Sequence, residues 1–289
     1  MPLDFLGVLR VKGADSIPFL QGQLSNDVRL VGSDRALLAG YHNPQGRAIA
    51  LLRLLQVAGD DLLAILPREL VVPVAQRLGK FILRSKVKLA DESGQWSLSG
   101  LIEQGHRDEA LPDTVNGVTR RDGALAVRLA GQPARWLLVT PASGPLDSPD
   151  PEAVERAALW ERLAIAAGEP EVYAATSEAF VAQMLNLDAL GAIAFDKGCY
   201  TGQEIIARAH YRGRVKRRMQ RFLTEERAQL APGDNGTLRD GRAFKVVRAI
   251  HRDGGRCEFL AVVGTDGGAG AASAVLSARP LELPYSLPD

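Results

Sequence analysis

The chain has 289 residues, of which 46% are hydrophobic and 24% charged, with a formal net charge of +1. These values exclude an intrinsically disordered chain, which would contain too few apolar residues to form a core. No run approaches the roughly 20 consecutive apolar residues that cross a bilayer, and residues 1–13 lack the basic and apolar regions of a signal peptide. We therefore expect a cytoplasmic protein without a membrane partner, built from two or three compact units.

The first 90 residues alternate short apolar strands with two helices. The predicted strands are 5–11, 35–42, 47–57, 62–66 and 86–90. Helices are expected over 15–20, beginning at Asp15, and over 68–83, with Pro73 in the first turns. The turn sequence NPQG at 43–46 predicts a hairpin between the second and third strands. This order is typical of α/β layers of the ferredoxin-like type.

The rest of the chain changes from mixed to all-β character. Further strands are predicted at 96–103, 117–121, 124–129 and 136–139, followed by a linker at 141–151 and a helix at 152–167 that ends at Gly168. The C-terminal part predicts short strands at 218–223, 244–251 and 257–263, with a Gly/Ala-rich loop at 264–274. Because no long helix follows, we expect a small antiparallel β-barrel there, and an α+β fold class overall.

The cysteine and histidine content argues against a metal site. Cys199 and Cys257 are the two cysteines, and one pair so far apart in sequence is no disulfide framework for a chain of this size. The four histidines form no H-x-x-x-H pattern, and there is no C-x-x-C. We therefore expect reduced thiols and no metal ligands.

The ten residues FDKGCYTGQE, at 195–204, contain more kinds of reactive and polar side chains than a plain helix start requires. A strand at 192–195, a turn at Gly198 and a helix over 200–211 would place Cys199 at or just before a helix N-terminus. The helix macrodipole and nearby Lys197 would both favour the thiolate there. The pattern predicts a reactive cysteine of low pKa.

The following helix supplies two more polar groups. Glu204 and Arg208 are four residues apart, the spacing of a helical ion pair, and Tyr200 lies one turn before Glu204 on the same predicted face. Each of these side chains alone is also typical of a buried filler or a solvated helix surface. Their convergence predicts a functional group formed by Lys197, Cys199, Tyr200 and Glu204.

The sequence KGCYTGQE, followed by ARAHYRGRVKR, resembles the signature of the YgfZ family, folate-binding relatives of the glycine-cleavage T protein, an aminomethyltransferase. Four further blocks resemble the family in the same order and extend the resemblance to nearly the whole chain. They are GADSIPFLQGQLSNDV at 13–28, FILRSKV at 81–87, the block at 166–199, and LPYSLPD at 283–289.

The resemblance implies a cloverleaf of two interleaved ferredoxin-like units, over residues 1–213, and a C-terminal β-barrel, over 214–289, around a central channel that holds tetrahydrofolate. It also implies support for the assembly or repair of iron–sulfur clusters in client enzymes, including those that methylthiolate tRNA. The expected partners are therefore folate and iron–sulfur client or assembly proteins.

Several side chains are candidates for the folate contacts. Trp160, which stands at the family's tryptophan position before A-G-x-P, lies at the border of an apolar helix face, where an indole either anchors the core or forms a wall for the pterin ring. Gln21, Gln23 and Asn26 lie where the first helix should end, and alone they would also suit a polar turn. The signature adds Gly202, Gln203 and Arg208.

Three functions remain open from the sequence. A folate-dependent aminomethyltransferase would need a positioned acid or base, and the N-terminal half contains no recognisable motif for one, so enzymatic activity stays undecided. A folate-binding helper for iron–sulfur proteins accounts for the signature. Direct tRNA binding would use the run 208–221, which holds seven basic residues and no acidic one.

Overall fold

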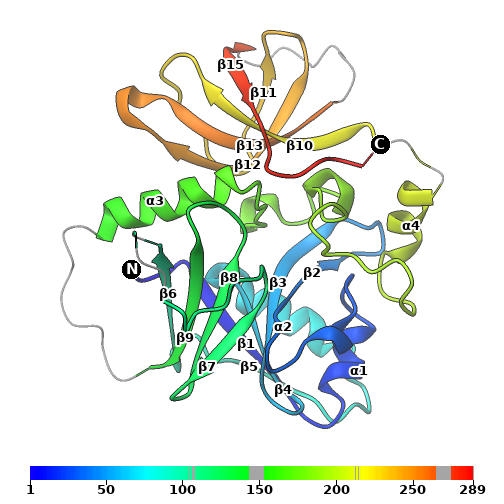
Figure 1. Ribbon diagram of the computed structural model, residues 1–289. Helices are drawn as coiled ribbons and strands as arrows, with labels where there is room; N and C mark the ends of the chain where they lie inside the picture. Colours follow the sequence, from blue (N-terminus) through cyan, green and yellow to red (C-terminus); the bar gives the residue numbers. More distant parts are fainter. Residues whose placement is uncertain are drawn as a thin grey trace.

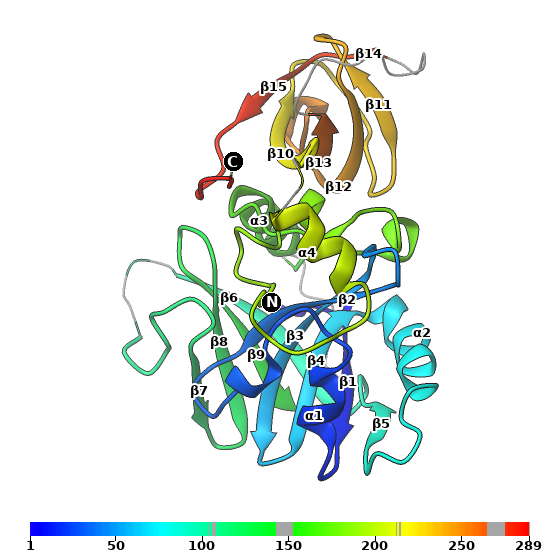
Figure 2. The same ribbon diagram turned by 90° about the vertical axis from the view of Figure 1, so that its right-hand side faces the viewer.

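The computed structural model of the chain describes residues 1–103, 105, 108–142, 153–211, 213, 215–264 and 275–288. Within these residues, four α-helices and three sheets form an α+β fold, and the C-terminal sheet is rolled into a nearly closed barrel (Figure 1). The chain end returns from the barrel to its junction with the other two sheets (Figures 1 and 2). The expected linker at 141–151 and the expected loop at 264–274 fall mostly outside the described residues.

The first sheet is antiparallel and has the strand order β2-β3-β4-β1-β5. Its strands are β1 (Leu6–Lys12), β2 (Leu37–His42), β3 (Ala48–Ala58), β4 (Asp61–Pro67) and β5 (Lys88–Asp91). Its helices are α1 (Ser16–Gln21) and α2 (Arg68–Gly79), and the short 3₁₀ turn η1 (Val28–Leu30) follows α1. All five predicted strands are confirmed. The helix expected to reach residue 83 ends instead at Gly79, because a turn closed by the bond from Phe81 N–H to Leu78 O replaces its last residues.

The second sheet has the order β6-β9-β8-β7 and is also antiparallel. It consists of β6 (Trp96–Ile102), β7 (Val118–Arg121), β8 (Ala124–Leu129) and β9 (Arg135–Pro141). Helix α3 (Ala153–Ala166) packs Trp160 onto this sheet beside Gly100, where a Cβ atom would lie only 2.6 Å from the indole ring. As predicted, the helix stops at Gly168, whose φ is +64°.

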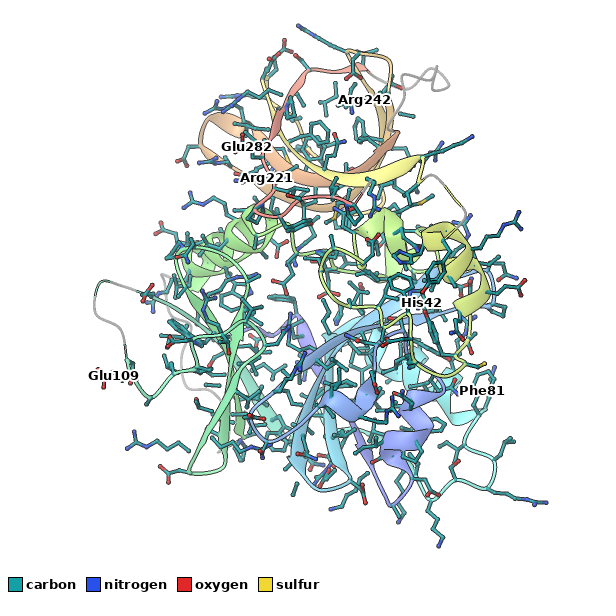
Figure 3. All side chains as sticks on the ribbon, turned by 45° about the vertical axis from the view of Figure 1, so that its right-hand side comes forward. His42, Phe81, Glu109, Arg221, Arg242 and Glu282 are labelled. Carbon is teal, nitrogen blue, oxygen red and sulfur yellow. The ribbon has the colours of Figure 1, made fainter. Side chains whose placement is uncertain are left out.

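The barrel has the strand order β14-β11-β12-β13-β10-β15. Its strands are β10 (Arg217–Thr224), β11 (Asn235–Leu238), β12 (Ala243–His251), β13 (Cys257–Gly264), β14 (Val275–Leu276) and β15 (Ala278–Leu281), with the turn η4 (Asp253–Gly255) between β12 and β13. The barrel core includes Phe222, Phe244 and Phe259, and Figure 3 shows Arg221 and Arg242 on the barrel, remote from His42. The sequence predicted β10, β12 and β13. It missed the three shorter strands, because β14 has only two residues, β11 contains a glycine and β15 contains a proline.

A long connection between α3 and β10 contains little regular structure. It consists of the turns η2 (Ala174–Thr176) and η3 (Ala182–Leu185), an irregular stretch, and helix α4 (Gln203–Tyr211). The predicted strand at 192–195 is wrong, because this stretch is not paired with any strand of the described residues. The predicted helix start at 200 is also wrong by three residues.

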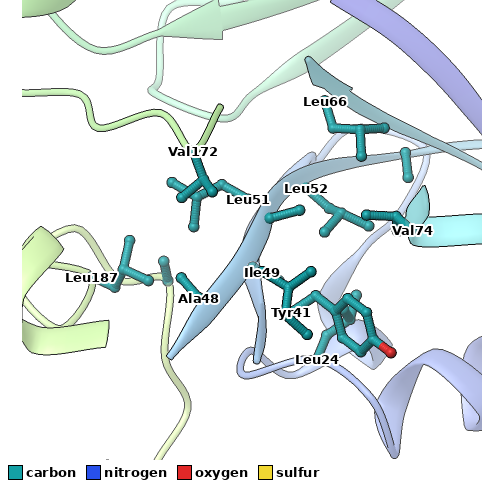
Figure 4. Close-up of a cluster of buried hydrophobic side chains, with 14 of the residues drawn as sticks. Leu24, Tyr41, Ala48, Ile49, Leu51, Leu52, Leu66, Val74, Val172 and Leu187 are labelled. Carbon is teal, nitrogen blue, oxygen red and sulfur yellow. The ribbon is translucent and has the colours of Figure 1, made fainter. Parts of the chain in front are cut away.

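This connection covers one face of the first sheet and completes the largest hydrophobic core. In β3, Leu52 faces Val74 of α2 on one side, while Leu51 faces Val172 of the connection on the other (Figure 4). Strand β3 is therefore buried on both faces, which explains its nearly continuous apolar sequence. The irregular segment is held by its apolar side chains rather than by a ladder of backbone hydrogen bonds.

Two buried ion pairs fasten the barrel to the rest of the protein. Arg218 of β10 donates to both carboxylate oxygens of Asp188 at 2.7 and 2.9 Å, and each side chain is only 5% exposed. Arg248 of β12 binds Glu161 of α3 in the same bidentate way at 2.6 and 2.5 Å. A bidentate pair tolerates little relative movement of its two elements, so these contacts fix the position of the barrel.

We predict that Asp188→Ala will lower the free energy of unfolding by about 3–5 kcal/mol, because it leaves the Arg218 guanidinium buried without its carboxylate. Urea denaturation would measure the loss. Asp240→Ala is the matched control, since it removes the partly exposed partner of Arg242 and should cost less than about 1 kcal/mol. Equal losses in the two variants would contradict the structural role assigned to the Arg218–Asp188 pair.

Candidate functional site

Lys197 is the organising residue of the signature segment. Its buried ammonium group donates to the carbonyl oxygens of Gln21, Leu24 and Asn26 at 2.7, 2.7 and 2.9 Å. Burial lowers the pKa of this ammonium to about 8. All three donors of the group are directed to the backbone of the 21–26 loop, so Lys197 joins the signature to the end of α1 instead of pointing at the thiol.

Tyr200 is 8% exposed, and its ring lies 5.0 Å from the Lys197 ammonium in a cation–π contact. Burial raises the pKa of its phenol to about 12, so the hydroxyl is neutral. Glu204, by contrast, is exposed, and no ion pair joins it to Arg208 in the part of the chain that the structure describes. The predicted common face of Tyr200 and Glu204 is wrong, because Tyr200 precedes the helix.

Cys199 is exposed and lies four residues before the first residue of α4. The sequence predicted a position at or just before a helix N-terminus, and in the structure three residues separate Cys199 from the helix. The intervening turn is closed locally, since Gln203 accepts a hydrogen bond from Tyr200 N–H through its Oε1 atom at 3.3 Å. The signature thus presents its thiol on a surface loop.

Gly202 brings the signature into contact with the predicted hairpin turn. Its φ is +82°, and a Cβ atom there would lie 2.5 Å from Asn43 O and 3.0 Å from the Cα atom of Gly46. The Asn43 side chain is buried, accepts from Arg47 N–H at 3.0 Å and donates to Glu178 at 2.5 Å. The glycine is required because the two backbones approach too closely for any side chain.

The polar residues of the 21–26 loop are largely occupied by their own fold. Gln21 donates to Asp27 at 3.0 Å and accepts from the Val28 amide at 2.7 Å, while Asn26 donates to the carbonyls of Leu38 and Gly191. Gln23 is different, because its buried Oε1 atom has no hydrogen-bond partner among the described residues. Of the three loop residues predicted to bind folate, Gln23 alone keeps a free acceptor.

His42 was not predicted from the sequence. It lies at the end of β2, is fully buried, and neither ring nitrogen has a hydrogen-bond partner within the described ranges. Burial lowers its pKa to about 4, so the ring is neutral. A lone histidine at the end of an apolar strand was the signal available in the sequence.

Trp160 lies elsewhere, beside a cavity of about 50 Å³ where all three sheets meet. Its walls include residues of β1, β2, β3, β4, β8, β9 and β12. The fourteen lining residues are Phe5, Leu6, Leu38, Leu51, Arg53, Ile65, Leu129, Arg135, Leu137, Trp160, Glu169, Pro170, Glu171 and Arg248. None of the predicted residues at 21–26 or 197–208 is among them, so the structure divides the predicted folate contacts between two places.

Charged groups fill much of this cavity. Glu169 pairs with Arg53 at 2.8 Å and with Arg135, and these cations hold the Glu169 pKa at about 2 although burial opposes ionisation. The Arg135 guanidinium also lies 5.0 Å from the centre of the Trp160 ring. The indole is thus both a core anchor and a wall of the cavity, which are the two roles that its sequence position allowed.

Glu171 has a different environment in the same cavity. Its carboxyl group accepts a hydrogen bond from the neighbouring Val172 amide at 3.0 Å. Burial raises its pKa to about 7, and Arg248 opposes that shift. This carboxyl group, which accepts one hydrogen bond among the described residues, lines a cavity that also holds three arginines, Arg53, Arg135 and Arg248. The segment GEPEV at 168–172 was the sequence signal for it.

The described part of the chain holds no group of three or more His, Cys, Asp and Glu side chains arranged to bind a metal ion. None of its helices is both long enough and apolar enough to span a membrane.

Comparison with known proteins identifies the family, although no protein-family model matches the chain. A protein named "tRNA-modifying protein YgfZ" from Pectobacterium carotovorum is 31% identical over 278 residues, which cover 91% of this chain and 83% of the relative. Two Escherichia coli proteins of the same name are 34% and 33% identical over 281 and 282 residues, covering 92% of this chain and 85% of each relative. The chain belongs to the YgfZ family.

A likeness to one solved structure supports the fold of this YgfZ-family chain. The aminomethyltransferase T of the glycine cleavage system from Bartonella henselae superimposes with a TM-score of 0.66, over 91% of this chain and 77% of its own. The identity is 12%, so the likeness is one of fold alone.

We predict that Gly202→Ala will destabilise the protein by about 2 kcal/mol more than Gly191→Ala. Both glycines have positive φ, at +82° and +64°, so both variants strain the backbone, but only at position 202 does the new Cβ atom collide with Asn43 O. Chemical denaturation measures the difference, and hydrogen exchange at residues 43–47 should rise in the Gly202 variant alone. Equal stability of the two variants would refute the close contact.

Proposed function

We propose that this YgfZ-family protein binds tetrahydrofolate in the cavity beside Trp160 and supports the assembly or repair of iron–sulfur clusters in client enzymes, including those that methylthiolate tRNA. The observation that carries the proposal is the convergence of an indole, three arginines and the Glu171 carboxyl group at the junction of the three sheets. The name of the relatives, which refers to tRNA modification, also supports a role in this process.

The chemistry of the cavity suits a folate. A pterin ring offers adjacent N–H donors and a flat apolar face, which match the Glu171 carboxyl group and the Trp160 indole, while the benzoyl-glutamate tail is an anion that matches Arg53 or Arg135. The cavity has a volume of about 50 Å³, far below the roughly 300 Å³ of a small-molecule pocket. Binding therefore requires the lining side chains to move, with Arg135 leaving the face of the indole.

The exposed Cys199 is the second element of the proposal. Its loop is anchored by Lys197 and Gly202, so the thiol is presented from a fixed surface position where a partner protein can reach it. We propose that this thiol acts with the client rather than on folate, because Cys199 does not line the Trp160 cavity.

The alternatives have weaker support. Transfer of an aminomethyl group has in its favour a fold likeness at 12% identity. Direct tRNA binding would use the basic run 208–221, but Arg218 and Arg221 of that run are paired with Asp188 and Glu258 and are not free to bind phosphate. We therefore prefer the proposed role in supporting iron–sulfur clusters of client enzymes.

We predict saturable binding of tetrahydrofolate by the full chain in an anaerobic calorimetric titration. Glu171→Gln should weaken that binding at least tenfold, since a neutral amide replaces the acceptor carboxylate, and Trp160→Phe should weaken it by a smaller factor. Glu204→Gln, which changes an exposed carboxylate outside the cavity, is the control and should bind like the parent. Absence of binding by the parent would remove the folate proposal, and an unaffected Glu171 variant would remove this cavity as the site.

We also predict that a cell lacking the gene will show reduced tRNA methylthiolation, that the parent gene will restore it, and that Cys199→Ala will not. Cys257→Ala is the matched control, because Cys257 is buried in the barrel core and has no access to a partner. Mass spectrometry of tRNA nucleosides provides the measurement. Full rescue by Cys199→Ala would exclude the thiol from the mechanism.

A further inference from the structure

The loop that follows α2 presents a rigid apolar projection. Phe81 N–H donates to Leu78 O at 2.9 Å, Ser85 N–H to Ile82 O at 2.7 Å, and Lys86 N–H to the Asp15 carboxylate at 2.7 Å. These bonds hold both ends of the segment 81–83, which is named here the apolar tip. Ile82 packs against the largest hydrophobic core, so the loop fixes the conformation of the tip while Phe81 and Leu83 stay exposed.

Exposure of the apolar tip exceeds what solubility favours. Leu83 is 90% exposed, the highest value among the large hydrophobic side chains of the described residues, and Phe81 is 46% exposed. Figure 3 shows Phe81 at the outer margin of the molecule, away from the barrel. Exposed apolar side chains are common singly, but two within three residues of a projecting loop are typical of a contact surface.

The backbone at Leu83 is also unfavourable. Its φ is +47°, in the left-handed region where the Cβ atom of an L-residue crowds the following carbonyl. Glycine or asparagine occupies such a position at lower cost. The chain therefore retains a strained leucine where a turn alone would favour a small polar residue, and strain of this kind is concentrated at functional positions.

The surroundings of the apolar tip are basic. Lys80, Arg84 and Lys86 are exposed, and the structure shows no ion pair for any of them within the residues it describes. Asp15 is the one acidic residue lining the open hollow of about 730 Å³ beside the tip, and its carboxylate already accepts the Lys86 amide. The surface is thus an apolar projection with a positive rim.

We infer that the apolar tip is the docking site for a partner protein that offers an apolar pocket bordered by acidic side chains. Charge complementarity sets the acidic border, and the projecting shape requires a concave partner. A nucleic acid fits less well, because the aliphatic Leu83 has neither a flat ring on which to stack a base nor a polar group to read one. The inference deepens the proposed function, on which it rests, by naming the surface that meets the iron–sulfur client.

A photoreactive benzoylphenylalanine at position 83 of the full chain tests the contact directly in cells. Position 30 is the matched control, since Leu30 is also exposed, at 46%. The expected result is a crosslink from position 83, absent from position 30, to an acidic peptide of another protein, which Arg84→Glu reduces at least fivefold. A crosslink to a second copy, a nuclease-sensitive crosslink or no specific crosslink would overturn the inference.

Leu83→Asn tests the function of the contact without endangering the fold, because asparagine relieves the left-handed strain while removing the apolar group. We expect Tm to stay the same or rise by about 2 °C, folate affinity to match the parent, and rescue of tRNA methylthiolation to fall at least threefold. Leu30→Asn should rescue fully. If the parent rescues and Leu83→Asn rescues equally, docking is wrong; if the parent itself fails to rescue, the proposed function is wrong, and the crosslink still decides the docking.

Discussion

Glu169 connects all three sheets of the protein. Its carboxylate pairs with Arg53 of the first sheet and Arg135 of the second, and its carbonyl oxygen accepts a hydrogen bond from Arg248 of the barrel at 3.3 Å. A buried guanidinium is tolerated only when it is paired, so Arg53 and Arg135 depend on the Glu169 carboxylate, whereas Arg248 has Glu161 as its charge partner. The relative placement of the sheets, the wall that Trp160 provides and the small size of the cavity all depend on that arrangement.

The second constraint is the density of backbone contacts around the signature segment. Lys197 binds three carbonyl groups of the 21–26 loop, and Gly202 lies directly on the hairpin turn at 43–46. Residues more than 150 positions apart in sequence are thereby held together without any shared sheet. The family signature is consequently in part a structural motif, in which Lys197 and Gly202 hold the loop that carries Cys199.

Much of the fold could be predicted from the sequence, because alternation of apolar residues and turn sequences such as NPQG report local structure directly. The end of α2 and the strand proposed at 192–195 were wrong, since tertiary packing and a local turn override propensity at those places. In the signature, Lys197, Tyr200 and Gly202 make packing contacts that the sequence did not predict, and their part in function stays a prediction. The direction of the Lys197 ammonium depends on carbonyl groups 170 residues away, which no local pattern encodes.

The grouping of the cavity residues also could not be predicted from a local sequence pattern. Arg53, Arg135 and Arg248 come from three sheets and share no sequence motif, so their convergence follows from topology alone. The cloverleaf arrangement, the division of the chain at residues 213 and 214 and the low thiol pKa stay predictions.

The different burial of the two cysteines also limits how the protein can respond to oxidants. Cys257 lies in the barrel core, where burial raises its thiol pKa to about 11, whereas Cys199 is on the surface. The folded molecule therefore exposes one thiol, and its other thiol is buried where it cannot resolve an oxidised Cys199. Any disulfide that Cys199 forms in the folded protein must join it to another molecule, so disulfide formation at this residue links the protein covalently to a partner.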